Sequence, residues 1–381
     1  MMGSSALQEL LANGPPGQEA IRAFLTSREF PIVEDWVATV VWYGAADEVR
    51  LRHWLSGLES DTRLQRVDGS ELWHLSFALP PGSRVEYKLE VRRGHEASWI
   101  RDPLNPHSAR DPFGENSVIE GEGYSTPQWA LYDAPTPHGE IVPLSIGSAA
   151  LGGVRSGWIY LPAHFSRSRR YPFMIVHDGS DYLNYASFKD VLDNLIHRQE
   201  VSELIVAGID SPDRLREYPN HEGHARFVTE ELLPHLEDTY PLVAEPHGRG
   251  LMGASFGAVA AFSIACRHPG KFGRLVLQSG SFAYTDESRE NWRGPLFEPV
   301  VAFMNEYRAA PRAVTERVYL SCGVYESLIY ENRSLAPLLE RTGMAVRFEE
   351  ARDGHNWVNW RDRMRSGLSW LFPGPQTLTY E

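Results

Sequence analysis

Residues 251–259 read LMGASFGAV, and the GASFG segment at 253–257 decides how the chain is interpreted. A short apolar strand is expected over 249–253, immediately before it, and an amphipathic helix over 256–268, immediately after it. Glycines on both sides of Ser255 permit a sharp strand-to-helix turn and close packing of the helix on the strand. Such a turn would present the Ser255 hydroxyl at the positive end of a helix. The segment therefore predicts a nucleophilic serine, and a glycine-flanked helix N-cap is the alternative.

The surrounding sequence predicts an α/β domain over residues 143–375. Apolar runs of strand length recur there and alternate with helix-length segments. The runs cover 157–162, 173–179, 204–210, 249–253, 274–280, 317–323 and 345–351. Buried strands that alternate with helices indicate a mostly parallel sheet with helices on both faces. Functional groups of such folds gather beyond the carboxyl ends of the strands, and Ser255 occupies such a position.

The N-terminal part has a different period. Residues 1–28 are expected to form a short helical segment. Residues 29–122 contain short alternating runs rich in Val, Trp, Tyr and Leu, including one over 48–55, and turn signals separate them. This spacing predicts an all-β sandwich domain. Residues 123–142, rich in Gly, Pro, Ser and Thr, are expected to link it to the α/β domain.

A serine hydroxyl needs a base that a third group orients, and hydrolases of this kind place the acid and then the histidine after the serine. His355 follows the last expected strand and precedes a helix, so we predict that it is the base. Glu326 comes directly after the preceding strand, and we assign it the orienting role. Asp353 is the alternative acid, although in a tight turn it is more typical of a turn cap. A Ser–His dyad without an acid is a further alternative.

Two backbone N–H groups are needed to hold the oxyanion of an acyl-transfer reaction. We expect the N–H of Phe256, the residue after the nucleophile, to supply one. The other is expected in the loop after the strand at 173–179, from Gly179 or Ser180. Asp178 is interpreted either as part of this site or as a residue that stiffens the loop.

Composition and charge exclude several other functions. The formal net charge of −13 argues against nucleic-acid binding and against anionic membranes. The two cysteines, Cys266 and Cys322, form no disulfide framework and are expected to be buried. His221 and His224 lack the spacing of a zinc motif, so we expect no metal and no cofactor. No secretory signal or membrane span is recognised, which predicts a cytoplasmic protein.

Several segments resemble those of the enterochelin (ferric enterobactin) esterase group of the esterase-D-like α/β-hydrolases. In the α/β part these are DG at 178–179, DSPDRLREYPN at 210–220, ELLPHL at 231–236, GASFG, QSGSF at 278–282 and DGHNWVNWR at 353–361. In the N-terminal part they are VATVVWYG at 37–44, LQRVDGSELWHL at 64–75 and DPLNP at 102–106. The segment GVYESLI at 323–329 resembles the acid segment of related feruloyl esterases, in which an Asp holds the place of Glu326. The similarity covers most of the chain. It implies an α/β-hydrolase fold that follows a small immunoglobulin-like sandwich.

The resemblance implies hydrolysis of the ester bonds of a catecholate trilactone siderophore, which would release iron in the cytoplasm. Four residues are candidates for contact with this anionic, aromatic substrate: Arg214, Arg216, Arg361 and Trp357. A solvated surface position or a structural ion pair is the alternative for each arginine. Core packing is the alternative for Trp357 and its neighbour Trp360. Two other functions stay open. One is an esterase for feruloyl, acetyl or other small aryl or sugar esters, and the other is a hydrolase fold used only for binding.

Overall fold

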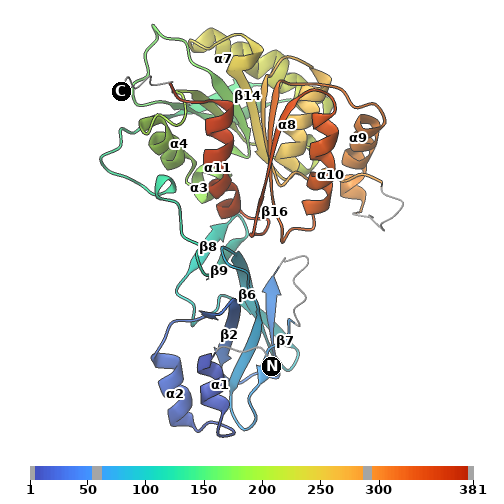
Figure 1. The fold of residues 1–381 in the computed structure, drawn as a ribbon. Helices are drawn as coiled ribbons and strands as arrows, with labels where there is room; N and C mark the ends of the chain where they lie inside the picture. Colours follow the sequence, from blue (N-terminus) through green and yellow to red (C-terminus); the bar gives the residue numbers. More distant parts are fainter. Residues whose placement is uncertain (1–4, 54–61, 286–293, 376–381) are drawn as a thin grey trace. The chain divides into compact units, whose positions relative to one another are not determined.

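The computed structural model describes residues 5–53, 62–285 and 294–375, and Figure 1 shows their ribbon. Residues 54 and 55 of the strand expected over 48–55, and the first four residues of the expected helical segment, lie outside this range. The chain divides into two compact units. The first consists of Met1–Ser125, Gly323–Ser327 and Ala351–Asn356. The second consists of Thr126–Cys322, Leu328–Glu350 and Trp357–Glu381.

The first unit contains two antiparallel sheets, with strand orders β1-β2-β5-β4 and β3-β6-β9-β8, and β7 pairs with β6. The strands of the first sheet are β1 (Ile32–Glu34), β2 (Val37–Tyr43), β4 (Gln65–Arg66) and β5 (Leu72–Ala78). Those of the second are β3 (Glu48–His53), β6 (Arg84–Arg93), β7 (Glu96–Ile100), β8 (Ser108–Asp111) and β9 (Gly114–Glu120). Two helices precede them, α1 (Ser5–Leu11) and α2 (Gln18–Thr26).

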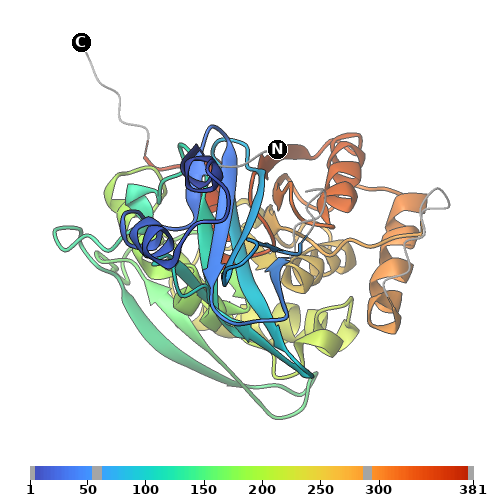
Figure 2. The same ribbon diagram turned by 90° about the horizontal axis from the view of Figure 1, so that it is seen from below.

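Both faces of β2 are covered by apolar groups, which explains its nearly continuous apolar sequence. Successive side chains of a strand point to opposite faces. Val40 therefore lies in a core shared with β6 of the other sheet, whereas Val41 packs among residues of α1 and α2. Figure 2 shows these two helices, in dark blue, beside the blue strands of the unit.

The second unit is built on an eight-stranded sheet of order β10-β11-β13-β12-β14-β15-β16-β17. Its strands are β10 (Glu140–Gly147), β11 (Val154–Leu161), β12 (Phe173–His177), β13 (Ile205–Ile209), β14 (Arg249–Ala254), β15 (Arg274–Gln278), β16 (Arg317–Gly323) and β17 (Ala345–Ala351). The strands from β13 to β16 are parallel to one another, and β10 and β11 are antiparallel additions. The expected mostly parallel sheet is thus present.

Helices cover both faces of this sheet, because alternate residues of its strands enter two separate apolar clusters (Figure 1). In β12, Ile175 faces one cluster and Val176 faces the other. The first cluster includes residues of α7 (Leu233–Thr239), α8 (Phe256–Arg267), α9 (Glu298–Ala309) and α10 (Ile329–Glu340). The second includes residues of α3 (Gly179–Tyr185), α4 (Phe188–His197) and α11 (Trp357–Leu371). Between β13 and α7 lie α5 (Arg214–Glu217), α6 (Glu222–Arg226) and η2 (Phe227–Leu232), and the remaining short turns are η1 (Gln128–Ala130), η3 (Pro246–Gly248) and η4 (Pro295–Phe297).

Two features differ from the sequence-based expectation. A helix, α3, begins at Gly179, where a loop was expected. The segments Gly323–Ser327 and Ala351–Asn356, expected within a continuous α/β domain over 143–375, group instead with the β-strands of the first unit. The physical reason is that their hydrogen bonds and apolar contacts involve residues near the start of β6, more than two hundred positions earlier in the chain.

Candidate active site

Ser255 stands at the sharp turn between β14 and α8, as the sequence predicts. Its backbone has φ 56° and ψ −121°, a conformation that L-residues rarely adopt and that persists only where the surroundings enforce it. A Cβ at Gly253 would lie 2.3 Å from the carbonyl carbon of Gly257, so only glycine permits this approach of strand and helix. The Ser255 N–H donates to the Gln278 carbonyl at 2.9 Å, which ties the turn to β15.

The Ser255 hydroxyl has a hydroxyl neighbour that the sequence analysis did not assign. Ser255 Oγ lies 3.2 Å from Ser281 Oγ, and the Ser281 N–H donates to the Ser255 carbonyl at 3.2 Å. Ser281 belongs to the QSGSF segment, so the signal was visible in the sequence, but no spacing rule links it to the nucleophile. It is buried and therefore forms part of the wall next to the serine.

Glu326 and His355 are brought together within the first unit. His355 Nδ1 lies 2.6 Å from Glu326 Oε2, and the other carboxylate oxygen accepts the Gly323 N–H at 2.7 Å. Since a carboxylate only accepts, the Nδ1 atom carries the proton and Nε2 is left as the basic nitrogen. The Glu326 side chain is 1% exposed and that of His355 is 33% exposed. A histidine that is oriented in this way is a candidate general base.

Asp353, the alternative acid, makes different contacts. Its Oδ1 accepts the Gly354 N–H at 2.7 Å and the Asn356 side-chain amide at 2.7 Å. It caps the turn that carries His355, while the imidazole hydrogen bond goes to Glu326. The geometry thus favours Glu326 over Asp353 as the orienting acid.

Phe256 and Gly179, two of the expected oxyanion donors, both occupy the first position of a helix. Phe256 begins α8 and Gly179 begins α3. The first backbone N–H groups of a helix have no hydrogen-bond acceptor within the helix, so they can bind a negatively charged group. Ser180 does not fit its expected role. Its N–H already donates to Asp210 Oδ1 at 2.9 Å, and its hydroxyl also bonds to Asp210, so Gly179 is the better donor.

The expected substrate-contact residues mostly have other partners. Arg214 forms a two-point ion pair with the buried Asp178, through Nε to Oδ1 at 3.0 Å and Nη2 to Oδ2 at 2.7 Å. Arg361 pairs with its neighbour Asp362 at 2.8 Å. Both arginines therefore fit the ion-pair alternative. Arg216 is exposed and stays a prediction.

Trp357 and Trp360 are core residues, so the structure favours the packing alternative over the expected substrate contact of Trp357. Their ring centroids lie 4.7 Å apart, and Trp357 also packs edge-on against Tyr182 of α3 at 5.2 Å. The indole N–H of Trp360 donates to Ser279 Oγ at 2.8 Å. Trp360 thereby fixes the carboxyl end of β15, from which Ser281 follows.

Two buried histidines lie beneath the Ser255 turn, and sequence patterns did not single out one of them, His177. His177 Nδ1 contacts the Met252 carbonyl at 3.0 Å, and its Nε2 lies 3.1 Å from His224 Nε2. Because the Met252 carbonyl only accepts, His177 Nδ1–H donates to it, and His224 then donates to His177. Burial lowers the pKa of His177 to about 4 and also lowers that of His224, so both rings are neutral at pH 7. His221 Nδ1 accepts the His224 N–H and caps α6.

A cavity of about 590 Å³ lies beside the eight-stranded sheet, at the edge where its parallel strands begin. Its lining includes Tyr171 and Pro172, which precede β12, whereas Ser255 follows the carboxyl end of the parallel strand β14. This cavity contains none of the predicted catalytic residues.

Among the described residues no group of His, Cys, Asp and Glu could hold a metal ion. No helix in the same part of the chain is long and apolar enough to span a membrane.

Comparison with known families places residues 148–371 within the family described as "Putative esterase". The Iron(III) enterobactin esterase of Escherichia coli O6:H1 is 25% identical over 332 residues, which is 80% of this chain and 80% of that protein. The acetyl esterase of Caldicellulosiruptor saccharolyticus is 33% identical over 170 residues, which is 39% of this chain and 64% of that protein.

Solved structures share the fold. The ferric enterobactin esterase from Salmonella typhimurium superposes with a TM-score of 0.74 at 22% identity, covering 89% of this chain and 95% of its own. The Shigella flexneri enterobactin esterase, solved in the presence of enterobactin, gives 0.73 at 21% identity and covers 92% and 97%. A ferulic acid esterase from Anaeromyces mucronatus gives 0.52 at 15% identity and covers 65% and 96%.

Proposed function

This chain belongs to the Esterase family and is a carboxylic ester hydrolase, and we propose that it is a serine esterase that hydrolyses the ester bonds of a catecholate trilactone siderophore. Ser255 is the nucleophile, His355 the general base and Glu326 the acid that orients the imidazole. The 2.6 Å hydrogen bond between Glu326 and His355 is the observation that supports these catalytic roles. It supports a defined tautomer in which Nε2 is ready to accept a proton.

The mechanism is acyl transfer through the serine. His355 Nε2 removes the proton from Ser255 Oγ as that oxygen attacks the ester carbonyl. The oxyanion of the tetrahedral intermediate is held by the N–H groups of Phe256 and Gly179. The alcohol leaves with the proton from His355 and an acyl-serine remains. A water molecule, deprotonated by His355, then hydrolyses the acyl-serine and returns the enzyme to its starting state.

The substrate class is supported by similarity across the N-terminal part as well as the α/β part. The match to the E. coli Iron(III) enterobactin esterase extends over 80% of the chain, and the Esterase family model covers residues 148–371. We propose that the first unit is an immunoglobulin-like domain of the kind found in that group. The exposed Arg216 is the candidate for contact with the anionic substrate, because Arg214 and Arg361 are already paired.

A second substrate class is favoured by one observation. The acetyl esterase relative has a higher identity, 33%, although over a shorter segment. An acetyl or feruloyl ester of a sugar is therefore the alternative substrate. The serine mechanism is the same in both cases, so the two proposals differ only in which ester is cleaved.

The test is a hydrolysis assay of the wild-type chain on four esters: ferric enterobactin, iron-free enterobactin, 4-nitrophenyl acetate and a feruloyl sugar ester. The siderophore proposal expects the highest kcat/KM on a trilactone, and the ferric to iron-free ratio shows whether iron is released from the complex. A kcat/KM on enterobactin far below that on the aryl or feruloyl ester would contradict it and support the alternative.

A further inference from the structure

We propose that the β-strand domain of the first unit holds the Glu326–His355 pair in its active geometry, and that Arg84 at the start of β6 is a positioning residue for hydrolysis. This inference rests on the proposed serine mechanism, in which His355 is the base. It assigns the N-terminal domain a role in the chemical step itself, for substrates of any size.

Glu326 and His355 lie on two short segments that are joined by backbone hydrogen bonds. Gly323–Ser327 begins at the last residue of β16 and carries Glu326. Ala351–Asn356 begins at the last residue of β17 and carries His355. The Val324 N–H donates to the Ala351 carbonyl at 2.7 Å, and the Tyr325 N–H donates to the Asp353 carbonyl at 3.2 Å. Both segments belong to the same compact unit as the β-sandwich strands.

The segment that carries Glu326 is anchored through Tyr325, its immediate neighbour. The Tyr325 ring is 6% exposed and lies in the apolar core formed by the two sheets. Its hydroxyl lies 2.6 Å from Ser83 Oγ, and Ser83 is fully buried. The β-strand domain therefore holds Tyr325, the residue before Glu326, by apolar packing and by a hydrogen bond.

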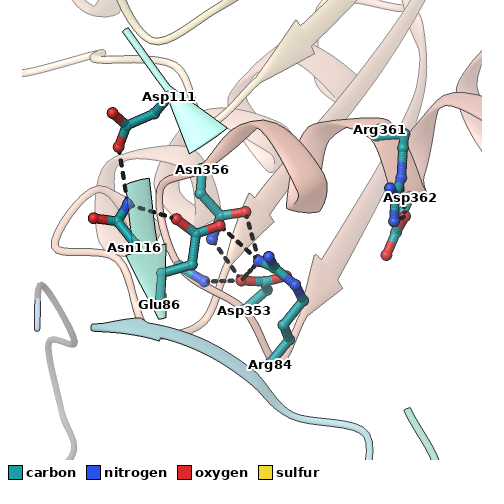
Figure 3. A network of polar contacts seen from close by, with 9 residues as sticks. Arg84, Glu86, Asp111, Asn116, Asp353, Asn356, Arg361 and Asp362 are labelled. Atoms are coloured by element: carbon teal, nitrogen blue, oxygen red, sulfur yellow. Dashed lines mark hydrogen bonds and ion pairs between the residues drawn. The ribbon is translucent and has the colours of Figure 1, made fainter. Parts of the chain in front are cut away.

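The segment that carries His355 is anchored by Arg84 on both sides of the histidine (Figure 3). The Arg84 N–H donates to the Arg352 carbonyl at 2.9 Å. Its guanidinium Nη1 donates to Asn356 Oδ1 at 3.1 Å and lies 3.8 Å from Asp353 Oδ1. Asp353 in turn accepts from the Gly354 N–H and from Asn356, so the residues before and after His355 are both held.

Arg84 is itself fixed within the domain. It is 3% exposed, and a buried guanidinium requires charged and hydrogen-bonding partners. Besides the loop, it donates to Glu86 Oε1 at 2.9 Å. The other oxygen of Glu86 accepts from Asn116 at 2.9 Å, and the same amide nitrogen of Asn116 also donates to Asp111 at 2.9 Å. Figure 3 shows this connected set of side chains, which reaches from β8 and β9 through β6 to the histidine loop.

The chemistry makes the position of His355 critical. Misplacing a catalytic group by about 1 Å reduces the rate on the order of a hundredfold. An arginine that holds the loop on both sides of the base therefore affects kcat, whereas a residue that only binds substrate affects KM. The distinction can be measured with a small ester such as 4-nitrophenyl acetate, which offers few groups for substrate binding.

The experiment measures kcat and KM of Arg84→Gln and Arg84→Lys on 4-nitrophenyl acetate and on iron-free enterobactin. Arg84→Gln is expected to lower kcat about 10- to 100-fold on both esters with little change in KM. Arg84→Lys, which keeps the charge without the guanidinium fork, should recover part of that loss. Arg52→Gln is the matched control, because Arg52 lies on the same sheet and pairs there with Glu90. It should retain wild-type kcat.

A double variant separates positioning from general destabilisation. If Arg84 acts through His355, adding Arg84→Gln to His355→Ala should cause no further loss of the residual rate. Should Arg84→Gln fail to fold, Tyr325→Phe removes only the hydroxyl that contacts Ser83 and should lower kcat on both esters by a smaller factor. A kcat within twofold of wild type for folded Arg84→Gln on the aryl ester, or an equal further loss in the His355→Ala background, would overturn the inference.

The same assays distinguish a failure of the positioning role of Arg84 from a failure of the proposed serine mechanism. If Ser255→Ala abolishes hydrolysis while folded Arg84→Gln keeps the wild-type kcat, the serine mechanism stands and only the positioning role is lost. If Ser255→Ala retains activity, the proposed mechanism fails, whatever the Arg84 variants do.

Discussion

The Nδ1 atom of His355 lies 2.6 Å from Oε2 of Glu326, and the other oxygen of that carboxylate is held by the Gly323 N–H. The two residues are 29 positions apart in the chain, and each follows the end of a different strand. Glu326 is buried, and each of its carboxylate oxygens accepts a hydrogen bond. It therefore orients the imidazole through Nδ1 alone. The proposed mechanism depends on this relationship.

Replacing Glu326 with glutamine should reduce kcat without unfolding the protein. The amide can offer an N–H to the imidazole and so favours the wrong tautomer, which in serine hydrolases lowers kcat by up to about 10⁴-fold. We expect a loss on the order of 10² to 10⁴-fold, measured on 4-nitrophenyl acetate. Glu350→Gln is the control, because Glu350 pairs with Arg333 on the exposed part of β17. A Glu326→Gln enzyme with wild-type kcat would point to a Ser–His dyad.

Replacing Gly253 with alanine should destabilise the fold through the serine turn. The new methyl group would meet backbone atoms of Gly257 at 2.3–2.4 Å, and backbone cannot move aside as a flexible side chain can. We expect a loss of roughly 3 kcal/mol or more in the free energy of unfolding, measured by urea denaturation. Gly147→Ala is the matched control at the end of β10, where an added Cβ meets nothing within 4 Å. Similar unfolding curves for both variants would contradict the tight packing of β14 against α8.

The pH dependence of stability should report the buried histidines. Burial lowers the pKa of His177 from 6.5 to about 4, so between these pH values the unfolded chain binds more protons than the folded one. The free energy of unfolding therefore rises with pH through this window and levels off above it. From pH 7 to pH 5 the loss from His177 alone is about 2 kcal/mol.

Chemical denaturation at pH 5, 6 and 7 measures this slope. His177→Gln should be less stable at pH 7, because it disturbs the contacts to Met252 and His224, but should show a shallower slope. His95→Gln, which replaces an exposed histidine of the first unit, is measured alongside as the control. An unaltered slope in His177→Gln would mean that other groups cause the pH dependence.

Local patterns predicted the parts of the site that depend on neighbours in the sequence. The strand, the glycines and the helix around Ser255 lie within about twenty residues of one another, and their geometry follows from glycine sterics and apolar periodicity. The order of serine, acid and histidine follows the pattern of hydrolases of this kind. The position of each residue after a strand follows from the rule that parallel strands present their carboxyl ends at one edge. The structure accordingly has β14, β16 and β17 ending at Ala254, Gly323 and Ala351.

Properties that depend on distant partners could not be predicted. The sequence does not reveal that Asp178 neutralises Arg214 from 36 positions away, or that Trp357 packs on Tyr182. The Ser83–Tyr325 contact joins residues 242 positions apart. The association of the catalytic loops with the β-strand domain was therefore invisible to composition and periodicity. The Ser180 N–H was misassigned for the same reason, because its partner Asp210 follows a different strand.

The most direct test of the account is hydrolysis of iron-free and ferric enterobactin by the wild-type chain and by Ser255→Ala, with 4-nitrophenyl acetate as a reference ester and circular dichroism to confirm folding. We predict that the wild type cleaves the trilactone and that folded Ser255→Ala cleaves neither the trilactone nor the aryl ester above the rate that binding alone provides. Near-native hydrolysis by Ser255→Ala would contradict the serine mechanism. Serine-dependent cleavage of the aryl ester without any cleavage of enterobactin would contradict the siderophore substrate.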